Sequence, residues 1–392
     1  EKLDYGNEDY VEYIYDNHGR VTKQTYEDDS YVTYHYDNNG ALARVYDSQT
    51  DTTSTYYYDF TDRMMKYVEK SGTGTHTVGY TYDSINNLTK LVETIGNEKR
   101  ETSYTYDEDN RPTAVTADGG SRHYTYDHYG RVATLTTKHG NHTVTVQTYT
   151  YKTNTNGTPT NQISAMTVSD GNGNQRYAYT YTYDQKGNIT GISDGTYTTN
   201  YTYDSANQLI REDNEQANTT TVWTYDDAGN ILTRTVYPYT TEAVDTGTQT
   251  NYGYSNTQWG DLLTAYNNKP IVRDKIGNPT NDFTWYFSWQ HGRQLASMTR
   301  LGTSGGWWFT YNADGMRTQR TNGTTTYNYT YLGGQLTHMT VDGHTMYFSY
   351  DASGTPLSLT YDGTNYYYVT NLQGDVVAIL NTKTAAKIGC QR

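Results

Sequence analysis

A short motif, Tyr-x-Tyr-Asp-x-x-Gly, recurs along the 392-residue chain, and clean neighbouring copies lie 20 to 24 residues apart. Tyr13-Ile-Tyr15-Asp16-Asn-His-Gly19 is one copy, and Tyr34-His-Tyr36-Asp37-Asn-Asn-Gly40 is the next. This period is too short for a full-length helix with two strands, but it suits one β-hairpin. The repeat therefore predicts an all-β chain of tandem antiparallel hairpins that forms one long coiled sheet.

The residues of the motif have distinct predicted places in the hairpin. Alternating aromatics put two tyrosines on the same face of a strand. Asp is favoured at the first position of a type I turn and Gly at the fourth, where a left-handed residue completes a turn-plus-bulge connection. We therefore expect a structural turn role for Asp16, Gly19, Asp37, Gly40, Asp127, Gly130, Asp184, Gly187, Asp226, Gly229, Asp351 and Gly354.

Exchanges at the fourth turn position support a conformational role. Twelve copies have Gly in eight cases, Asp62 in one, and Asn in three, namely Asn86, Asn110 and Asn207. Asn and Asp are the non-Gly residues that best tolerate positive φ. A catalytic requirement would not allow these exchanges. Although paired carboxylates could hydrolyse glycosides, we interpret the recurring Asp as turn chemistry.

The composition explains how such a chain can fold. A net charge of −14 and few aliphatic residues would normally indicate disorder. However, the chain has 46 tyrosines, and each can bury about 150–250 Å² with its hydroxyl hydrogen-bonded. Tyrosine also fits a pleated, half-buried surface. A core of tyrosine rather than leucine is thus expected.

Several functional classes are disfavoured by the residues present. The acidic balance and scattered basic residues argue against nucleic-acid binding. One cysteine, Cys390, excludes a disulfide framework and a cysteine-based zinc site. No apolar run approaches a membrane helix, so we expect no membrane insertion by this segment. The polar start at Glu1 is no signal peptide and lies in mid-pattern, which suggests a fragment.

The Tyr-x-Tyr-Asp-x-x-Gly-Arg unit resembles the YD repeat of RHS proteins, bacterial wall-associated proteins, Tc toxin C components and teneurins. The resemblance covers essentially the whole chain, and residues 5–16 look like the start of such repeats. Residues 309–317 and 366–380 look like the RHS repeat-associated core. The resemblance implies hairpin repeats over 1–306, with irregular insertions near 154–174 and 236–269. It also implies the start of a core-like segment over 307–392.

The resemblance implies a function as well as a fold. RHS hairpins form a hollow shell around a C-terminal toxin, so the expected partner is an effector segment outside this chain and the expected location is secreted or at a bacterial surface. The family's self-cleaving protease region has an Asp-Pro motif that is absent here. No protease residues are carried over, and no catalytic residue or cofactor is expected. The alternative is a module that binds cell-surface carbohydrate or mediates adhesion.

Three other groups of residues are candidate sites. Asp170-Gly-Asn172-Gly-Asn174 begins like a calcium loop, but Gln175 and Tyr181 stand where Gly and Glu are required. His139 and His142 lack further ligands and fit a hairpin tip. No metal site is therefore expected. Aromatic side chains can stack on sugars, although packing is the preferred interpretation, and the candidates for stacking are Trp285, Trp289, Trp307 and Trp308.

Overall fold

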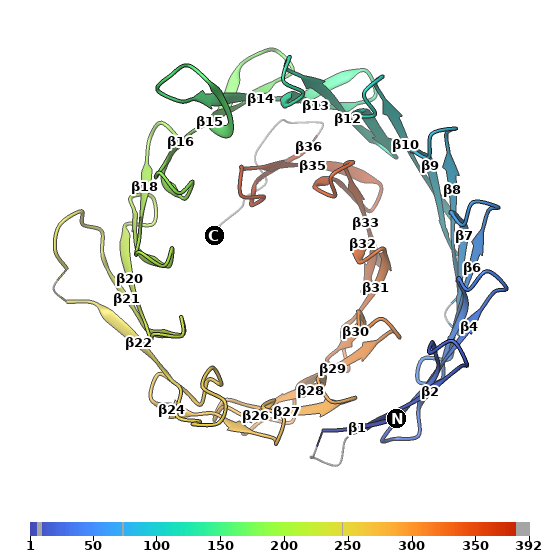
Figure 1. The fold of residues 1–392 in the computed structure, drawn as a ribbon. Helices are drawn as coiled ribbons and strands as arrows, with labels where there is room; N and C mark the ends of the chain where they lie inside the picture. Colours follow the sequence, from blue (N-terminus) through green and yellow to red (C-terminus); the bar gives the residue numbers. More distant parts are fainter. Residues whose placement is uncertain (6–9, 73, 245, 382–392) are drawn as a thin grey trace. The chain divides into compact units, whose positions relative to one another are not determined.

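The computed structural model describes all residues except 6–9, 73, 245 and 382–392. The described residues form strands and turns and no helix, as the repeat predicted (Figure 1). None of them therefore belongs to a helix that could cross a membrane. Cys390 and parts of the segments quoted for the RHS resemblance lie outside the described residues.

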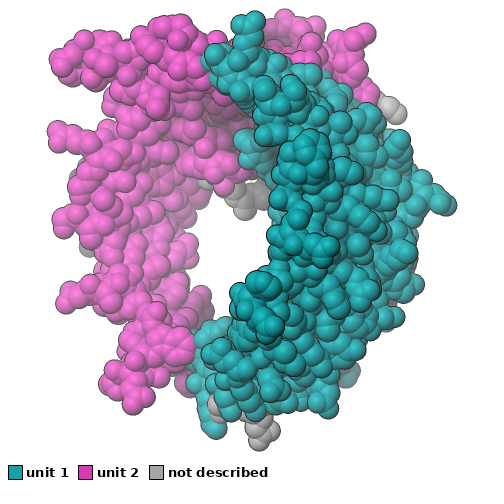
Figure 2. Space-filling model, turned by 45° about the vertical axis from the view of Figure 1, so that its right-hand side comes forward, with its two compact units in different colours: residues 1–122, 273–368 teal, residues 123–272, 369–392 magenta. Residues whose placement is uncertain are grey.

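The chain separates into two compact units (Figure 2). Unit 1 comprises residues 1–122 and 273–368, and unit 2 comprises residues 123–272 and 369–392. These divisions follow spatial contacts, so they do not test the boundary between repeats and core-like segment at residue 306, which stays a prediction.

Unit 1 contains two runs of strands. The first run is β1 (Lys2–Asp4), β2 (Tyr10–Tyr15), β3 (Val21–Tyr26), β4 (Tyr31–Tyr36), β5 (Leu42–Asp47), β6 (Thr52–Tyr58), β7 (Met64–Ser71), β8 (Gly74–Tyr82), β9 (Leu88–Ile95), β10 (Glu98–Tyr106) and β11 (Pro112–Ala117). The second run is β26 (Pro279–Asn281), β27 (Trp285–Gln290), β28 (Gln294–Arg300), β29 (Gly306–Tyr311), β30 (Arg317–Thr321), β31 (Thr326–Leu332), β32 (Gln335–Val341), β33 (His344–Tyr350) and β34 (Pro356–Tyr361).

Unit 2 contains the remaining strands, apart from three at the unit boundaries. Its strands are β13 (Val132–His139), β14 (His142–Thr153), β15 (Pro159–Asp170), β16 (Gln175–Tyr183), β17 (Ile189–Ser193), β18 (Thr198–Tyr203), β19 (Leu209–Asn214), β20 (Thr219–Tyr225), β21 (Ile231–Pro238), β22 (Thr248–Gly253), β23 (Ala265–Tyr266), β24 (Lys269–Pro270) and β36 (Val376–Asn381). The boundary strands are β12 (Gly120–Tyr126), β25 (Val272–Arg273) and β35 (Thr364–Thr370).

Consecutive strands pair in antiparallel fashion throughout each run, so each YD repeat is one hairpin. In the first hairpin Ile14 faces Lys23 and Tyr15 faces Val21, which leaves one extra residue in the return strand. The same register shift stands before the turn in most YD hairpins of both units. This is the turn-plus-bulge connection that the motif predicted.

The two runs of unit 1 lie against each other as layers. Val11, Tyr26, Val32 and Val45 form a buried cluster in the first layer, and Ala313 packs on it from the second layer. This packing gives the first layer a covered tyrosine face. Burial accordingly raises the pKa of Tyr34 and Tyr56 in the first layer to about 12.

Residues 154–174, for which the sequence suggested an irregular insertion, contain regular structure instead of a loop. The strand β15 spans Pro159–Asp170. Gly157 and Gly173 belong to tight turns at its two ends, where their amides donate to the carbonyls of Asn154 and Asp170. The Gly and Asn residues thus mark turns, and the threonines are β-branched residues that suit a strand. Residues 236–269 have only short strands after β21.

Candidate functional site

The turn of the repeat is held by one carboxylate, as Asp16 illustrates. The Gly19 amide donates to the Asp16 carbonyl oxygen at 3.1 Å. Asp16 Oδ1 accepts from the amides of His18 at 2.8 Å and Arg20 at 3.0 Å. The hydrogen bond from the Arg20 amide is the main cause that lowers the pKa of Asp16 to about 2. The carboxylate is therefore committed to the backbone of its own turn.

The other turn residues singled out in the sequence lie in the same geometry. The fourth-position amide donates to the first-position carbonyl in the turns that begin at Asp37, Asp127, Asp184, Asp226 and Asp351. All twelve fourth positions have positive φ, from 61° at Asp62 to 93° at Gly187. The left-handed conformation inferred from the Gly-to-Asn exchanges is thus the conformation that the structure has.

The fifth turn position adds a contact that sequence reasoning missed. Arg20 Nε and Nη2 both lie 2.7 Å from Asp16 Oδ2, beside the turn. In other repeats this residue also reaches the next turn: Arg63 Nη1 donates to Asn86 Oδ1 at 2.6 Å. The side chains of the fifth-position residues Asn87 and Asn188 likewise donate to Asn110 and Asn207.

These lateral bonds change the interpretation of the fourth position. All three asparagines there, Asn86, Asn110 and Asn207, accept a hydrogen bond from the fifth residue of the preceding repeat. Asparagine therefore both tolerates the left-handed conformation and links neighbouring turns. The signal in the sequence was an Arg or Asn one repeat earlier, immediately after the turn.

The second tyrosine of the motif has a recurring hydrogen bond to the neighbouring hairpin. The Tyr36 hydroxyl donates to the Val21 carbonyl oxygen at 2.8 Å, near the start of the previous return strand. The same bond is made by Tyr58, Tyr82, Tyr106, Tyr151, Tyr183, Tyr203, Tyr225, Tyr311 and Tyr350. We call this row the tyrosine ladder. It gives a reason for Tyr rather than Phe at this position.

Trp289 takes the ladder position in its own repeat. Its indole Nε1 donates to the Pro279 carbonyl oxygen at 2.7 Å. Pro279 stands at the same distance after its turn as Val21 stands after Asp16. A different ring thus supplies an equivalent donor. Trp289, considered a possible glycan-stacking residue from the sequence, is placed in the scaffold.

The other tryptophans proposed for stacking differ in their surroundings. Trp307 lies beside Arg320, whose guanidinium carbon is 5.2 Å from the ring centroid, and beside Tyr327. Trp285 is partly buried in β27. Trp308 is 44% exposed. The structure therefore leaves Trp308 as the most accessible of the four.

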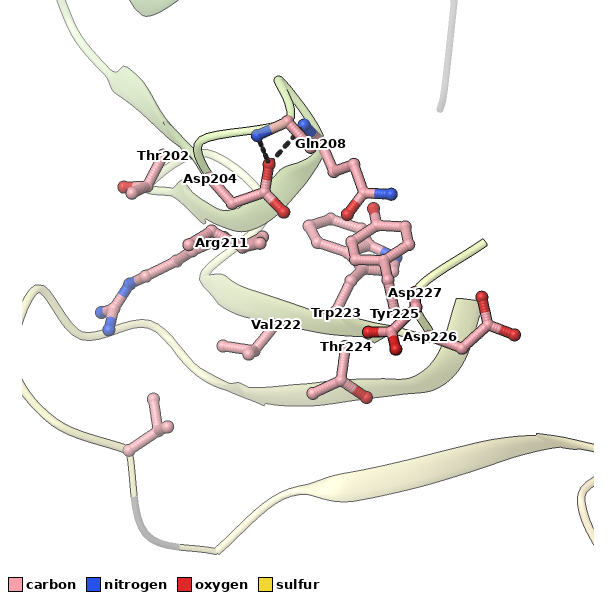
Figure 3. Close-up of a pocket in the computed structure, with 13 residues that line it drawn as sticks. Thr202, Asp204, Gln208, Arg211, Val222, Trp223, Thr224, Tyr225, Asp226 and Asp227 are labelled. Carbon is pink, nitrogen blue, oxygen red and sulfur yellow. Dashed lines mark hydrogen bonds between the residues drawn. The ribbon is translucent and has the colours of Figure 1, made fainter. Parts of the chain in front are cut away.

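A cavity of about 730 Å³ lies in unit 2 beside Trp223 (Figure 3). Two of its charged groups are already engaged: Asp204 Oδ1 accepts from the Gln208 amide, and Arg211 binds Asp213 and the Thr240 carbonyl. Asp226 holds the Asn230 amide in the same way. None of the lining residues is a His, Cys, Ser or Lys. The cavity thus assembles no nucleophile with an adjacent base.

The two possible metal sites have other structural roles. Asp170 Oδ1 accepts from the Asn172 and Asn174 amides, while Arg176 Nη2 lies 2.6 Å from Asp170 Oδ2. A guanidinium therefore stands where a cation would bind. His139 and His142 face each other across the tip of the β13–β14 hairpin. Within the described part of the chain, no three His, Cys, Asp or Glu side chains gather as a metal site would require.

Comparisons with known proteins agree with this geometry. The RHS Repeat family model matches residues 82–122 and 106–142. A tRNA3(Ser)-specific nuclease WapA from Bacillus spizizenii is 34% identical over 193 residues, or 47% of this chain and 8% of that protein. A tRNA nuclease WapA from Bacillus subtilis is 31% identical over the same shares.

A solved structure extends the likeness to nearly the whole chain. The crystal structure of TcdB2-TccC3-TEV matches with a TM-score of 0.51 and 12% identity. The match covers 95% of this chain and 26% of the solved chain, so this chain spans a small part of its relatives. At that identity the likeness concerns the fold. The family model thus places RHS repeats at residues 82–142, and the solved structure shows a similar all-β fold over nearly the whole chain.

Proposed function

We propose that this chain is part of a shell that encloses a C-terminal effector polypeptide and helps to deliver it to competing cells. The observation that carries the proposal is that the residues of the motif are committed to the sheet. Asp16 holds its own turn, and Tyr36 binds the preceding hairpin. The chain is thus proposed as scaffold rather than catalyst.

The relatives support separate roles for the repeats and the effector segment. They are named as nucleases, and the stretch that matches this chain takes up 8% of their length. An activity of the kind in their names would reside in a separate segment. A protein of this type acts on other cells, so we propose a secreted or surface location on a bacterial cell.

The test uses the complete reading frame that contains this chain. The encoded protein is treated with a protease at neutral pH, and its fragments are identified by mass spectrometry. We expect the segment after the repeats to resist cleavage while the repeats are folded, and to become sensitive when the repeats unfold in denaturant. A downstream segment that is cleaved at once, or a frame without such a segment, would contradict enclosure.

An adhesion module that binds carbohydrate is the second candidate, and the exposed Trp308 is the observation in its favour. A flat aromatic surface of this kind can stack on a sugar ring. A glycan array with the intact chain tests it, with Trp308→Ala as the variant and Trp259→Ala, which is also partly exposed, as the matched control. Binding that depends on Trp308 alone would support adhesion, whereas an array without binding would exclude it.

A further inference from the structure

Three histidines lie between the two layers of unit 1. His291 of the second layer stacks on Tyr26 of the first, with ring centroids 3.7 Å apart and an interplanar angle of 11°. His76 of β8 and His338 of β32 lie at a second place along the same contact. Histidine is the side chain that ordinarily changes charge between pH 5 and 8.

Two of these histidines have acidic partners. His76 is 6% exposed, and its Nε2 lies 2.8 Å from Glu93 Oε1. His291 Nε2 lies 3.7 Å from Asp28 Oδ2. A carboxylate at such distances compensates a positive charge on the ring. His76 and His291 therefore each have a carboxylate beside the ring within the layer contact.

His338 has a different environment. Its ring stacks on Tyr347 at 4.8 Å, and the Arg100 guanidinium of the first layer lies 4.1 Å from the centroid of Tyr347. Glu93 is the nearby acid, but its Oε1 already accepts from His76 and, at 2.7 Å, from Thr337 Oγ1. Within the described residues, the His338 ring makes no hydrogen bond to a carboxylate.

The charges around His338 therefore become unbalanced in acid. His76 and Arg100 contribute positive charge, and Glu93 contributes one negative charge. Burial and, after it, the charge of Glu98 raise the pKa of Tyr347. A charged His338 would stand beside the Arg100 guanidinium in a partly buried contact whose one nearby carboxylate, Glu93, is already bound to His76. Uncompensated buried charge is strongly destabilising.

We propose that mild acid loosens the contact between the two layers of unit 1, and that charging of His338 is the step that loosens it. The inference concerns unit 1 alone and holds whether or not the chain encloses an effector. It gives the fold a response to acidic compartments or acidic surroundings. The device acts by charge repulsion between layers that are otherwise held by hydrogen bonds and packing.

The titration of His338 supports this direction. Burial is the main cause that lowers its pKa from the ordinary 6.5; the charges of His76 and Arg100 lower it further, and Glu93 opposes them. The folded state thus favours the neutral ring. Its contribution to stability is present above pH 6.5 and is lost as pH falls through the lower folded value. The turn carboxylates, with pKa values below the ordinary 3.8, stay ionised in this window.

Hydrogen exchange of the whole chain at pH 7.5 and 5.5 tests the proposal, with protection expressed relative to the intrinsic exchange rate at each pH. We expect protection of peptides from β9 and β32 to fall severalfold at pH 5.5, because the folded state favours the neutral His338 ring. Peptides from β18 to β20, which contain no histidine, serve as an internal control and should keep their protection. An equal change in both regions, or no change, would overturn the proposal.

Two variants assign the effect to its residue. His338→Gln keeps a polar side chain without a charge and should abolish most of the fall in protection, whereas His142→Gln at an exposed hairpin tip should not. A fall that persists in His338→Gln would overturn the role of His338. If His338→Gln already lowers protection at pH 7.5, His338→Asn is used, and the unmodified chain with its internal control still decides whether acid acts on unit 1.

Discussion

Unit 1 and unit 2 use the same hairpin repeat in two different settings. In unit 1, the first layer is covered by hairpins more than 200 residues further along the chain, as the contacts of Arg122 with Asp351 and of Glu93 with Thr337 show. In unit 2, the segment after residue 369 contacts the sheet at Gln147 and Tyr181, whereas at β20 the Thr220 hydroxyl donates to the carbonyl of Thr240, 20 residues away. Each hairpin therefore forms its turn and its strand pairing within its own sheet. The second layer adds burial to the hairpins of unit 1.

The difference appears in the groups that are buried. Arg122 and Asp351 form an ion pair at 2.8 Å with side chains only 4% and 2% exposed. The turn pair of Arg20 and Asp16 is 31% and 20% exposed. Removing one partner of a buried pair leaves an uncompensated charge, while exposed pairs contribute little. The layer contact is thus the part of unit 1 most sensitive to substitution.

The largest effect is expected at alkaline pH, and it should be greater in unit 1, which has several buried tyrosines, than in unit 2, where burial raises the pKa of Tyr181 to about 12. Burial raises the pKa of Tyr34, Tyr56 and Tyr80 in unit 1 from 10.0 to about 12. Because the fold favours the neutral phenol, this stability is present below pH 10 and is lost as pH rises toward 12. We expect unit 1 to unfold in this interval, as followed by circular dichroism and tyrosinate absorbance. Replacing all three by Phe should raise the midpoint, while Tyr57→Phe, at an exposed position, should not.

The second largest effect is expected from Arg122→Met. This change leaves the Asp351 carboxylate buried without its partner and should cost about 3–5 kcal/mol of the stability of unit 1. Denaturant unfolding, read from unit 1 by hydrogen exchange, measures the loss. Arg20→Met is the matched control and should cost less than about 1 kcal/mol. Equal losses of stability in the two variants would contradict a larger contribution from the buried pair than from the exposed turn pair.

A smaller effect is expected at the fourth turn position, equally in both units. Gly19 in unit 1 has a φ of 78° and Gly187 in unit 2 a φ of 93°. Substitution by Ala places a Cβ in the left-handed region and should cost roughly 1–2 kcal/mol, whereas substitution by Asn should cost less. Thermal unfolding of the four variants provides the measurement. Ala and Asn variants of equal stability would contradict the conformational role of this position.

The smallest effect is expected from the tyrosine ladder, again with the same size in both units. Tyr106→Phe in unit 1 and Tyr203→Phe in unit 2 each remove one hydroxyl that donates to a carbonyl, at 2.8 and 2.9 Å. The expected cost is about 1 kcal/mol each. A cost confined to unit 1 would mean that the ladder depends on the second layer. Tyr57→Phe is again the control.

The sequence predicted the parts of this fold that are local. The conformation of a turn depends on four consecutive residues. The sequence revealed it because the fourth position is Gly19 in one repeat, Asn86 in another and Asp62 in a third. The strand β15 was missed because the Gly- and Asn-rich stretches on either side of it suggested an insertion, although Gly157 and Gly173 mark the turns at its ends. The Trp289 donor was missed because the ring type differs from the motif.

The layer contacts could not be predicted in the same way. The repeats resemble one another, so no local pattern shows which hairpin of the second layer meets which hairpin of the first. Thr337 and His338 look like ordinary strand residues until Glu93 and Arg100 are placed beside them. The same reason hid the pairing of Arg122 with Asp351, since Asp351 also has an ordinary turn role.

Hydrogen exchange of the unmodified chain at pH 7.5 tests the comparison of the two units most directly. The peptides to compare are β8 and β9 in unit 1 and β18 and β19 in unit 2, which are paired hairpin strands of the same repeat type. We predict slower exchange in β8 and β9, because the second layer covers them and local opening must break its contacts. Equal protection, or faster exchange in β8 and β9, would contradict a stabilising second layer in unit 1.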